Sequence, residues 1–163
     1  MACNEDAERL LAAGELVGVY PEGFKGIGKP FAERYHLQRF GRGGFAATAI
    51  RARVPLIPCA IVGAEEIYPM IGNAKQVAEL LRLPYFPITP LFPWLGPVGM
   101  VPLPSRWIIE FGEPVPTAGR AGEGDADEAG DAGDAGDALA ARVRDTIQVR
   151  VDALVAERGP AFG

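Results

Sequence analysis

A short apolar run at residues 16–20 constrains the fold of this chain more than any other stretch. The run is brief and rich in valine, and Pro21-Glu22-Gly23 closes it, which is typical of a buried strand that ends in a turn. A carboxylate directly after a buried strand lies where α/β folds bind their ligands, so Glu22 is a candidate functional residue. The alternative is a strand-end turn in which Glu22 pairs with a nearby lysine or arginine.

The order of the remaining elements predicts the fold class. Apolar runs at 56–62 and 107–112 predict two more strands. Helices are predicted over 4–13, 44–53 and 74–82, the last with Val77, Leu80 and Leu81 as its buried stripe. Strand, helix and strand in succession over 16–62 indicate a βαβ unit, although Pro58 is more typical of an edge strand or a bulge. We therefore expect an α/β fold, a single domain with a mixed, mainly parallel sheet flanked by helices.

Charge is distributed unevenly along the chain. The net charge is −5, but residues 118–137 alone carry seven acids and one base in Ala, Gly and Asp repeats. We expect this segment to be a flexible acidic linker. Residues 24–53 carry seven bases and one acid, which suits phosphate, a nucleotide or an anionic lipid surface. Lys29, Arg39 and Arg42 are the candidate contacts for phosphate or coenzyme A.

Two other segments complete the predicted organisation. Apolar residues recur at helical spacing over 138–158 and predict an amphipathic C-terminal helix, which we expect to dock on the domain at 4–117. Residues 83–104 are almost wholly apolar and uncharged, yet seven prolines exclude a regular membrane-spanning helix. This segment is expected to be a loop packed on the core or to lie in a membrane interface with Trp94 at headgroup depth, and the two are compatible.

Several patterns that suggest other chemistries are weak. Gly23 to Lys29 match the G-x-x-x-x-G-K of a phosphate loop, but Pro30 replaces the Ser or Thr that would hold Mg²⁺. His36 is the single histidine, and its basic surroundings favour a surface or structural role over that of a general base. The pair Glu65 and Glu66 has no metal-ligand partners at useful spacing and predicts helix-capping or surface positions. We expect no metal site.

The N-terminal residues and the cysteines favour a cytosolic setting. Residues 1–6 are polar with no apolar run behind them, so no signal peptide is predicted, and no stretch predicts a transmembrane helix. The two cysteines, Cys3 and Cys59, suit reduced thiols, and Cys59 lies in an apolar run as a small core residue. We expect no nucleic-acid partner, and the oligomeric state stays open.

The segment from Val19 to Gly26, Val-Tyr-Pro-Glu-Gly-Phe-Lys-Gly, resembles the Phe-Pro-Glu-Gly-Thr-Arg block of the lysophospholipid/glycerol acyltransferase superfamily. Gly43-Gly44-Phe45 and the run at 54–61 resemble the next block, an apolar Val-Pro-Ile-Val-Pro strand. The Pro-rich stretch ending at 109–114 agrees as well. The similarity covers about residues 4–116. It is closest to the 1-acylglycerol-3-phosphate acyltransferase type, in the bacterial branch related to mono- and diacylglycerol acyltransferases.

The resemblance implies roles for residues of the first block. In the family this block binds glycerol phosphate or another polar acceptor, which implies acceptor binding by Glu22, Gly23 and Lys25. Lys25 stands where the family usually has Arg, and lysine does not bind phosphate in the bidentate way of arginine. The acceptor therefore either makes a looser phosphate contact or carries no phosphate. The co-substrate implied is acyl-CoA or acyl carrier protein, with no cofactor.

The family's catalytic His-x-x-x-x-Asp block has no counterpart here. It should precede the Pro-Glu-Gly block, but no histidine lies in the fifteen residues before the run at 16–20, and Gly41 stands five residues after His36. No catalytic residue can be assigned. The resemblance implies either the C-terminal part of a longer protein, incomplete at its N-terminus, or a degenerate copy.

The expected function follows from the resemblance. It is a fragment or mis-started form of an acyl-CoA-dependent O-acyltransferase that acts on a glycerolipid or similar lipid alcohol. We expect a peripheral protein at the cytoplasmic face of a membrane. The alternative is a non-catalytic lipid- or acyl-CoA-binding module, which needs only the basic loop, the apolar segment and the strand core.

Overall fold

The computed structural model describes residues 4–23, 26, 29–41, 43–80, 82, 86–117 and 131–160. The chain forms two compact units. Unit 1 comprises Met1–Glu22, Arg39–Cys59 and Phe111–Ile147, and unit 2 comprises Gly23–Gln38, Ala60–Glu110 and Gln148–Gly163.

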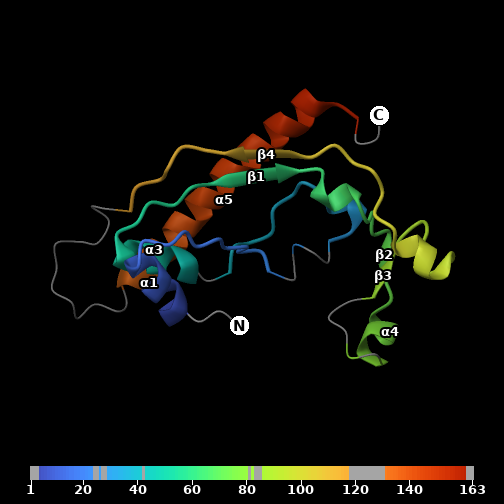
Figure 1. The fold of residues 1–163 in the computed structure, drawn as a ribbon, viewed down its shortest axis with the longest axis horizontal. Coiled ribbons are helices and arrows are strands. Elements are labelled where there is room, and N and C mark those ends of the chain that lie inside the picture. The colour runs from blue at the N-terminus through green and yellow to red at the C-terminus, as the bar shows by residue number, and fades with distance from the viewer. Residues whose placement is uncertain are drawn as a thin grey trace. The chain divides into compact units, whose positions relative to one another are not determined.

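Two short helices pack together in unit 1. Helix α1 (Asn4–Ala12) lies against α3 (Gly44–Ala52), as Figure 1 shows, and both agree with the helices predicted over 4–13 and 44–53. Helix α3 contributes Ala46, Ala49 and Ile50 to the core. Its small side chains let neighbouring backbone approach closely: a Cβ added at Gly136 would lie 3.1 Å from the Cβ of Ala47.

Helix α5 (Asp131–Arg158) includes the residues predicted as the C-terminal helix. Its apolar stripe is buried at Leu139, Val143, Val151 and Leu154. The helix begins at Asp131, inside the segment predicted as a linker, and residues 118–130 of that segment lie outside the described residues. Gly159 follows the helix with φ +74°, a left-handed conformation that glycine adopts readily at a helix C-terminus.

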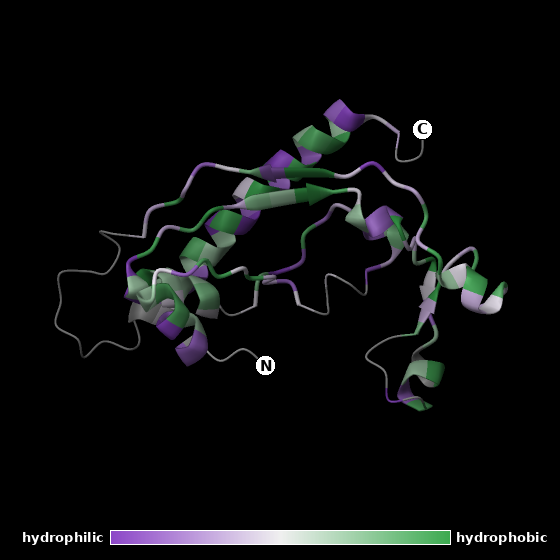
Figure 2. Ribbon diagram, in the orientation of Figure 1, coloured by the Kyte–Doolittle hydropathy of each residue, from purple (hydrophilic) through white to green (hydrophobic). Residues whose placement is uncertain are grey.

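The sheets are antiparallel, so the expectation of a mainly parallel sheet is wrong. Strand β1 (Cys59–Val62) pairs with β4 (Ile108–Phe111), and Figure 1 shows the two running side by side in opposite directions. An antiparallel bridge between Leu56 and Val115 extends the pairing. Strands β2 (Gly72–Asn73) and β3 (Pro87–Ile88) form a second antiparallel pair. Both β1 and β4 are mainly hydrophobic (Figure 2).

The run at 16–20 does not form the predicted strand. Its backbone is irregular, and Leu16 and Tyr20 are 90% and 84% exposed. A strand is stable only where its N–H and C=O groups pair with a neighbouring strand, and no described residue pairs with this run in a sheet. The parallel βαβ unit therefore has no first strand among the described residues.

Helix α4 (Lys75–Leu80) corrects a second expectation. It is six residues long, and Ala78 is buried. Val77 and Leu80 of the predicted buried stripe are 37% and 83% exposed, and Leu81 lies outside the described residues. The exposure of Val77 and Leu80 shows that the predicted stripe is not the buried face of this helix.

Hydrogen bonds hold the proline-rich segment to residues 67 and 68, while the apolar side chains around its 3₁₀ helix are exposed. Leu103 N donates to Ile67 O (2.9 Å), and the Tyr68 hydroxyl donates to Met100 O (2.9 Å). Around the 3₁₀ helix η3 (Gly96–Met100) the apolar side chains are exposed by 54–76%: Trp94, Leu95, Val98, Met100 and Val101. Within the described part of the chain, no helix is both long and apolar enough to cross a membrane.

Candidate functional site

The Pro21-Glu22-Gly23 segment forms a turn rather than the end of a strand. Pro21 and Glu22 are half-buried, and Gly23 is exposed with φ +57°. Glycine populates this left-handed region without the steric penalty of a Cβ. Gly26 N donates to Gly23 O (3.2 Å), which tightens the turn. Lys25, the third predicted acceptor-binding residue, lies outside the described residues. The acceptor-binding roles of Glu22 and Gly23 stay predictions.

The three predicted phosphate contacts have different environments. Lys29 is 9% exposed, and its Nζ donates to His36 O (2.9 Å) and pairs with Glu65 (2.6 Å). For Lys29 to contact phosphate, its ammonium group would have to break its bonds to His36 O and Glu65. Arg39 is exposed, and Arg42 lies outside the described residues.

Gly63 turns the chain after β1 toward Glu65, the ion-pair partner of Lys29. It has φ +104°, and a Cβ there would lie 2.3 Å from Arg106 O. The Ser105 hydroxyl donates to Gly63 O (2.9 Å). The chain then turns directly into the 3₁₀ helix η2 (Ala64–Glu66), which carries Glu65 and Glu66. Only glycine fits this position, because both the conformation and the space exclude a side chain.

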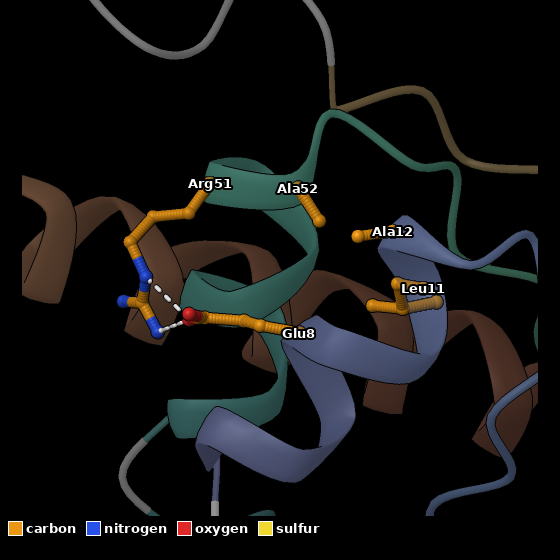
Figure 3. A pocket seen from close by; sticks show the side chains of 5 residues that line it. All are labelled: Glu8, Leu11, Ala12, Arg51 and Ala52. Carbon is orange, nitrogen blue, oxygen red and sulfur yellow. Dashed lines mark hydrogen bonds and ion pairs between the residues drawn. The ribbon is translucent and has the colours of Figure 1, made fainter.

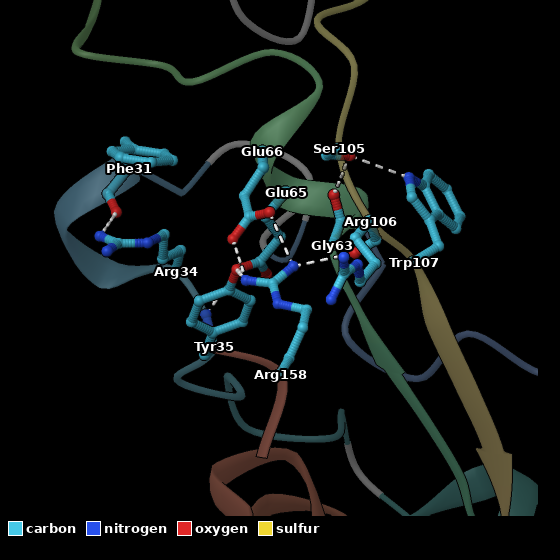
Figure 4. A network of polar contacts seen from close by, with 10 residues as sticks. All are labelled: Phe31, Arg34, Tyr35, Gly63, Glu65, Glu66, Ser105, Arg106, Trp107 and Arg158. Atoms are coloured by element: carbon cyan, nitrogen blue, oxygen red, sulfur yellow. Dashed lines mark hydrogen bonds and ion pairs between the residues drawn. The ribbon is translucent and has the colours of Figure 1, made fainter. Parts of the chain in front are cut away.

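A buried ion pair joins η2 to the end of α5 (Figure 4). Arg158 donates to both carboxylate oxygens of Glu66, at 2.8 and 2.5 Å, and the two side chains are 1% and 0% exposed. Arg158 also donates to Arg106 O (2.9 Å) and to the Tyr35 hydroxyl (2.8 Å). The expected helix-capping or surface position of Glu66 is therefore wrong. A carboxylate is found this deeply buried only when a charged partner compensates its lost hydration.

Tyr35 is bound on every polar group. Its N–H donates to Glu65 Oε2 (2.5 Å), its carbonyl accepts from Gln148 Nε2 (2.8 Å), and its hydroxyl accepts from Arg158. Gln148 Oε1 also accepts from Leu37 N (2.7 Å). Sequence reasoning missed Tyr35, Gln148 and Arg158. The available indication was a polar residue, Gln148, next to the apolar stripe of α5.

The groups that most often act as nucleophile or base offer little here. The His36 side chain is exposed, and Cys59 is half-buried. Burial raises the pKa of the Cys59 thiol above its ordinary value, which disfavours the nucleophilic thiolate. No cluster of three or more His, Cys, Asp or Glu suited to a metal ion occurs in the part of the chain that the structure describes.

A small pocket lies between α1 and α3 in unit 1 (Figure 3). Its volume is about 160 Å³, and its lining comprises Glu8, Leu11, Ala12, Arg51 and Ala52. Arg51 donates twice to Glu8 Oε1, at 2.9 and 2.6 Å. The polar groups of the pocket thus satisfy each other, which is typical of a contact that holds two helices together.

The segment that contains the Pro-Glu-Gly turn matches a known protein family. Residues 2–62 match the family model described as Acyltransferase. This match supports the acyltransferase superfamily, and the matched segment contains the Pro-Glu-Gly turn, α3 and β1. Of the network in Figure 4, it includes Tyr35 but excludes Glu65, Glu66 and Arg158.

Longer mycobacterial proteins resemble the whole chain. Uncharacterized proteins of Mycobacterium bovis and Mycobacterium tuberculosis are each 56% identical over 162 residues, and one of Mycobacterium leprae is 52% identical over 162 residues. The alignments cover 99% of this chain but only 43–44% of those proteins. The chain thus spans less than half the length of these relatives. No solved structure matches it at a significant level.

Proposed function

We propose that this chain is part of an O-acyltransferase that transfers a fatty acyl group to the hydroxyl of a glycerolipid or similar lipid alcohol. The observation that carries the proposal is the Pro21-Glu22-Gly23 turn inside the segment that matches the acyltransferase model. The proposed acyl donor is a thioester of coenzyme A or acyl carrier protein. The 1-acylglycerol-3-phosphate acyltransferase type and the bacterial branch related to mono- and diacylglycerol acyltransferases are part of the proposal.

The proposed reaction needs a base that removes the acceptor's hydroxyl proton. The oxygen then attacks the thioester carbon, the carbon–sulfur bond breaks, and the thiol leaves with a proton. More than half the length of the mycobacterial relatives lies outside the alignment. We propose that the His-x-x-x-x-Asp pair belongs to that part of a longer protein, and that this chain supplies the acceptor-binding turn.

Replacing Glu22 with glutamine is expected to weaken binding of a lysophospholipid acceptor about tenfold, since a hydrogen bond to a charged group contributes about 1.5–3 kcal/mol. Calorimetry with the acceptor below its micellar concentration measures this, and thiol release from acyl-CoA by the longer protein that carries the proposed His-x-x-x-x-Asp pair measures transfer. Glu15→Gln, an exposed carboxylate in the same matched segment, is the control.

The outcomes separate the two candidate functions. Transfer that falls with Glu22→Gln supports the enzyme. Binding that depends on Glu22 without any transfer supports the non-catalytic lipid- or acyl-CoA-binding module. Equal binding by the Glu15 and Glu22 variants contradicts a role for the turn in either function.

We also propose that the exposed segment around η3 contacts a membrane surface, at the cytoplasmic face. Residues 80–109 contain two arginines and no acid in a chain of net charge −5, and both Arg82 and Arg106 are exposed. Exposed Trp94 has the amphipathic ring that favours the headgroup region. Basic residues beside apolar ones suit an anionic lipid surface.

Trp94→Ser is expected to weaken partitioning onto vesicles of one part phosphatidylglycerol and three parts phosphatidylcholine about tenfold, because burial of a large apolar side chain contributes about 1.5–3 kcal/mol. Vesicle sedimentation measures the partitioning. Phe111→Ser, a 71% exposed aromatic in unit 1, is the matched control and should bind as the parent chain does. Equal losses from both variants would argue against this surface.

A further inference from the structure

Strand β4 has its charged and apolar sides reversed relative to a strand whose open side faces water. In an antiparallel sheet with one solvated face, polar side chains lie on that face and apolar side chains face the core. Successive side chains of β4 point to opposite sides, and their exposure alternates. Ile108 and Glu110 are half-buried on one side, whereas Ile109 and Phe111 are exposed on the other. The carboxylate is therefore on the covered side, and the apolar side chains are on the open side.

The side of the β1–β4 pair that carries Glu110 is covered by the chain itself. Arg150 of α5 donates to both carboxylate oxygens of Glu110. Strand β1 alternates in the same way as β4: Ala60 and Val62 are buried at 3% and 0% exposure, and Ile61 between them is half-buried. One side of the pair thus belongs to the core of the chain.

The opposite side of the pair is apolar, and we call it the outer surface, defined by Ile61, Trp107 and Ile109. Trp107 and Ile109 are 47% and 53% exposed. Trp107 directly precedes β4, and its position two residues before Ile109 places it on the same side of the extended chain. Exposed apolar area is unfavourable in water, and contiguous patches of it mark interaction sites.

The sequence of both strands is typical of a sheet that is covered on both faces. Such strands are nearly continuous hydrophobic runs, whereas a half-solvated strand alternates between apolar and polar residues. Residues 56–62 contain no charged side chain, and residues 107–111 contain one, Glu110, which α5 pairs. Within the part of the chain that the structure describes, only one of the two faces is covered.

The length of the mycobacterial relatives indicates what covers the outer surface. Their alignments include 99% of this chain but only 43–44% of their own length. More than half of each relative is therefore additional polypeptide, which is enough to form a further layer of secondary structure. A sheet buries an apolar face by packing against such a layer.

We propose that the outer surface is the interface with the remaining part of a longer protein, which packs a layer of apolar side chains against Trp107 and Ile109. The choice of this occupant rests on the proposed function, in which the chain is one part of a longer acyltransferase. The interface is intramolecular. It adds to the proposed function the surface of this chain that receives the rest of the enzyme.

Cysteine labelling tests the interface, with Ile109→Cys on the outer surface and Val149→Cys on the exposed side of α5 as the matched control. In this chain alone, both thiols should react with a maleimide at similar rates. In the longer protein, the thiol at position 109 should react at least about tenfold more slowly, because labelling then requires local opening. The rate at position 149 should stay within about twofold. Mass spectrometry of peptides assigns each labelled site.

Stability gives a second measurement that does not depend on labelling. Ile109→Ser changes an exposed side chain in this chain alone, so the urea midpoint should stay close to that of the parent chain. In the longer protein the same substitution should lower the midpoint, because it removes buried apolar contacts. Val149→Ser should leave both midpoints nearly unchanged.

Equal labelling rates at position 109 in the chain and in the longer protein would overturn the interface, as would equal protection at positions 109 and 149. Slow labelling of the chain alone that becomes faster on dilution would assign the surface to a second copy instead. Protection of the chain alone by phosphatidylcholine vesicles would assign it to lipid, which also overturns the proposal.

The interface and the proposed function can fail separately. Protection of position 109 in a longer protein that shows no Glu22-dependent transfer rejects only the acyltransferase function. Glu22-dependent transfer by a longer protein in which position 109 labels as fast as in the chain alone rejects only the interface.

Discussion

Replacing Arg158 with methionine is expected to destabilise unit 2 by about 3–5 kcal/mol, which is the typical effect of removing one partner of a buried ion pair. Glu66 is fully buried, and both of its carboxylate oxygens bind Arg158. Without the guanidinium, its charge would remain in an apolar environment without compensation. Urea unfolding followed by circular dichroism measures the loss.

Two companion variants make this result specific. Arg150→Met removes another arginine of α5, whose partner Glu110 is 35% exposed; hydrogen bonds from Arg150 lower the pKa of that carboxyl from its ordinary value of 4.5. Because this pair is solvated, we expect a much smaller shift of the urea midpoint. The double variant Glu66→Leu with Arg158→Met removes both charges and should recover most of the stability. An Arg158→Met chain as stable as Arg150→Met would contradict the buried pair.

Replacing Gly63 with alanine is expected to destabilise the chain by about 3 kcal/mol or more, because steric overlap and backbone strain act at the same position. The added Cβ would lie 2.3 Å from Arg106 O and 3.1 Å from Trp107 Cα, both backbone atoms that cannot rotate away. The φ of +104° is also unfavourable for alanine. The free energy of unfolding from urea titration measures this effect.

Gly133→Ala is the matched control for Gly63→Ala. Gly133 lies in α5, and no neighbouring atom lies within 4 Å of its added Cβ. Alanine is a better helix former than glycine, so this variant should be more stable than the parent chain by about 0.5–1 kcal/mol. If both substitutions have the same small effect, Gly63 does not determine the turn that carries Glu65 and Glu66.

The helices could be predicted because their determinants are local. The apolar spacing in 138–158 and the glycine at 159 predict most of α5, and similar spacing predicts α1 and α3. The runs at 56–62 and 107–112 likewise predict where β1 and β4 lie. Apolar runs do not indicate whether two strands pair in parallel or antiparallel fashion. The antiparallel arrangement of β1 and β4 is therefore known only from the structure.

Some features of the candidate site could likewise be predicted from the sequence, and others could not. The Pro-Glu-Gly block and its resemblance to acyltransferases can be read from contiguous residues, and the family match over 2–62 supports that reading at the level of the superfamily. The roles of Glu22, Gly23 and Lys25 in acceptor binding remain predictions. The environment of Lys29 could not be predicted, because its acceptor Glu65 follows 36 residues later, beyond a helix and a strand.

By itself, the sequence determined the positions of the main helices, the two apolar strands and the family block, because each depends on neighbouring residues. Only the tertiary structure decided that Glu66 is a buried ion-pair partner and that Gln148 holds the backbone beside His36. These contacts join residues 92 and 113 positions apart, Glu66 to Arg158 and Tyr35 to Gln148. The physical reason is that charge pairing and hydrogen bonding depend on distance in space, which local residue patterns do not specify.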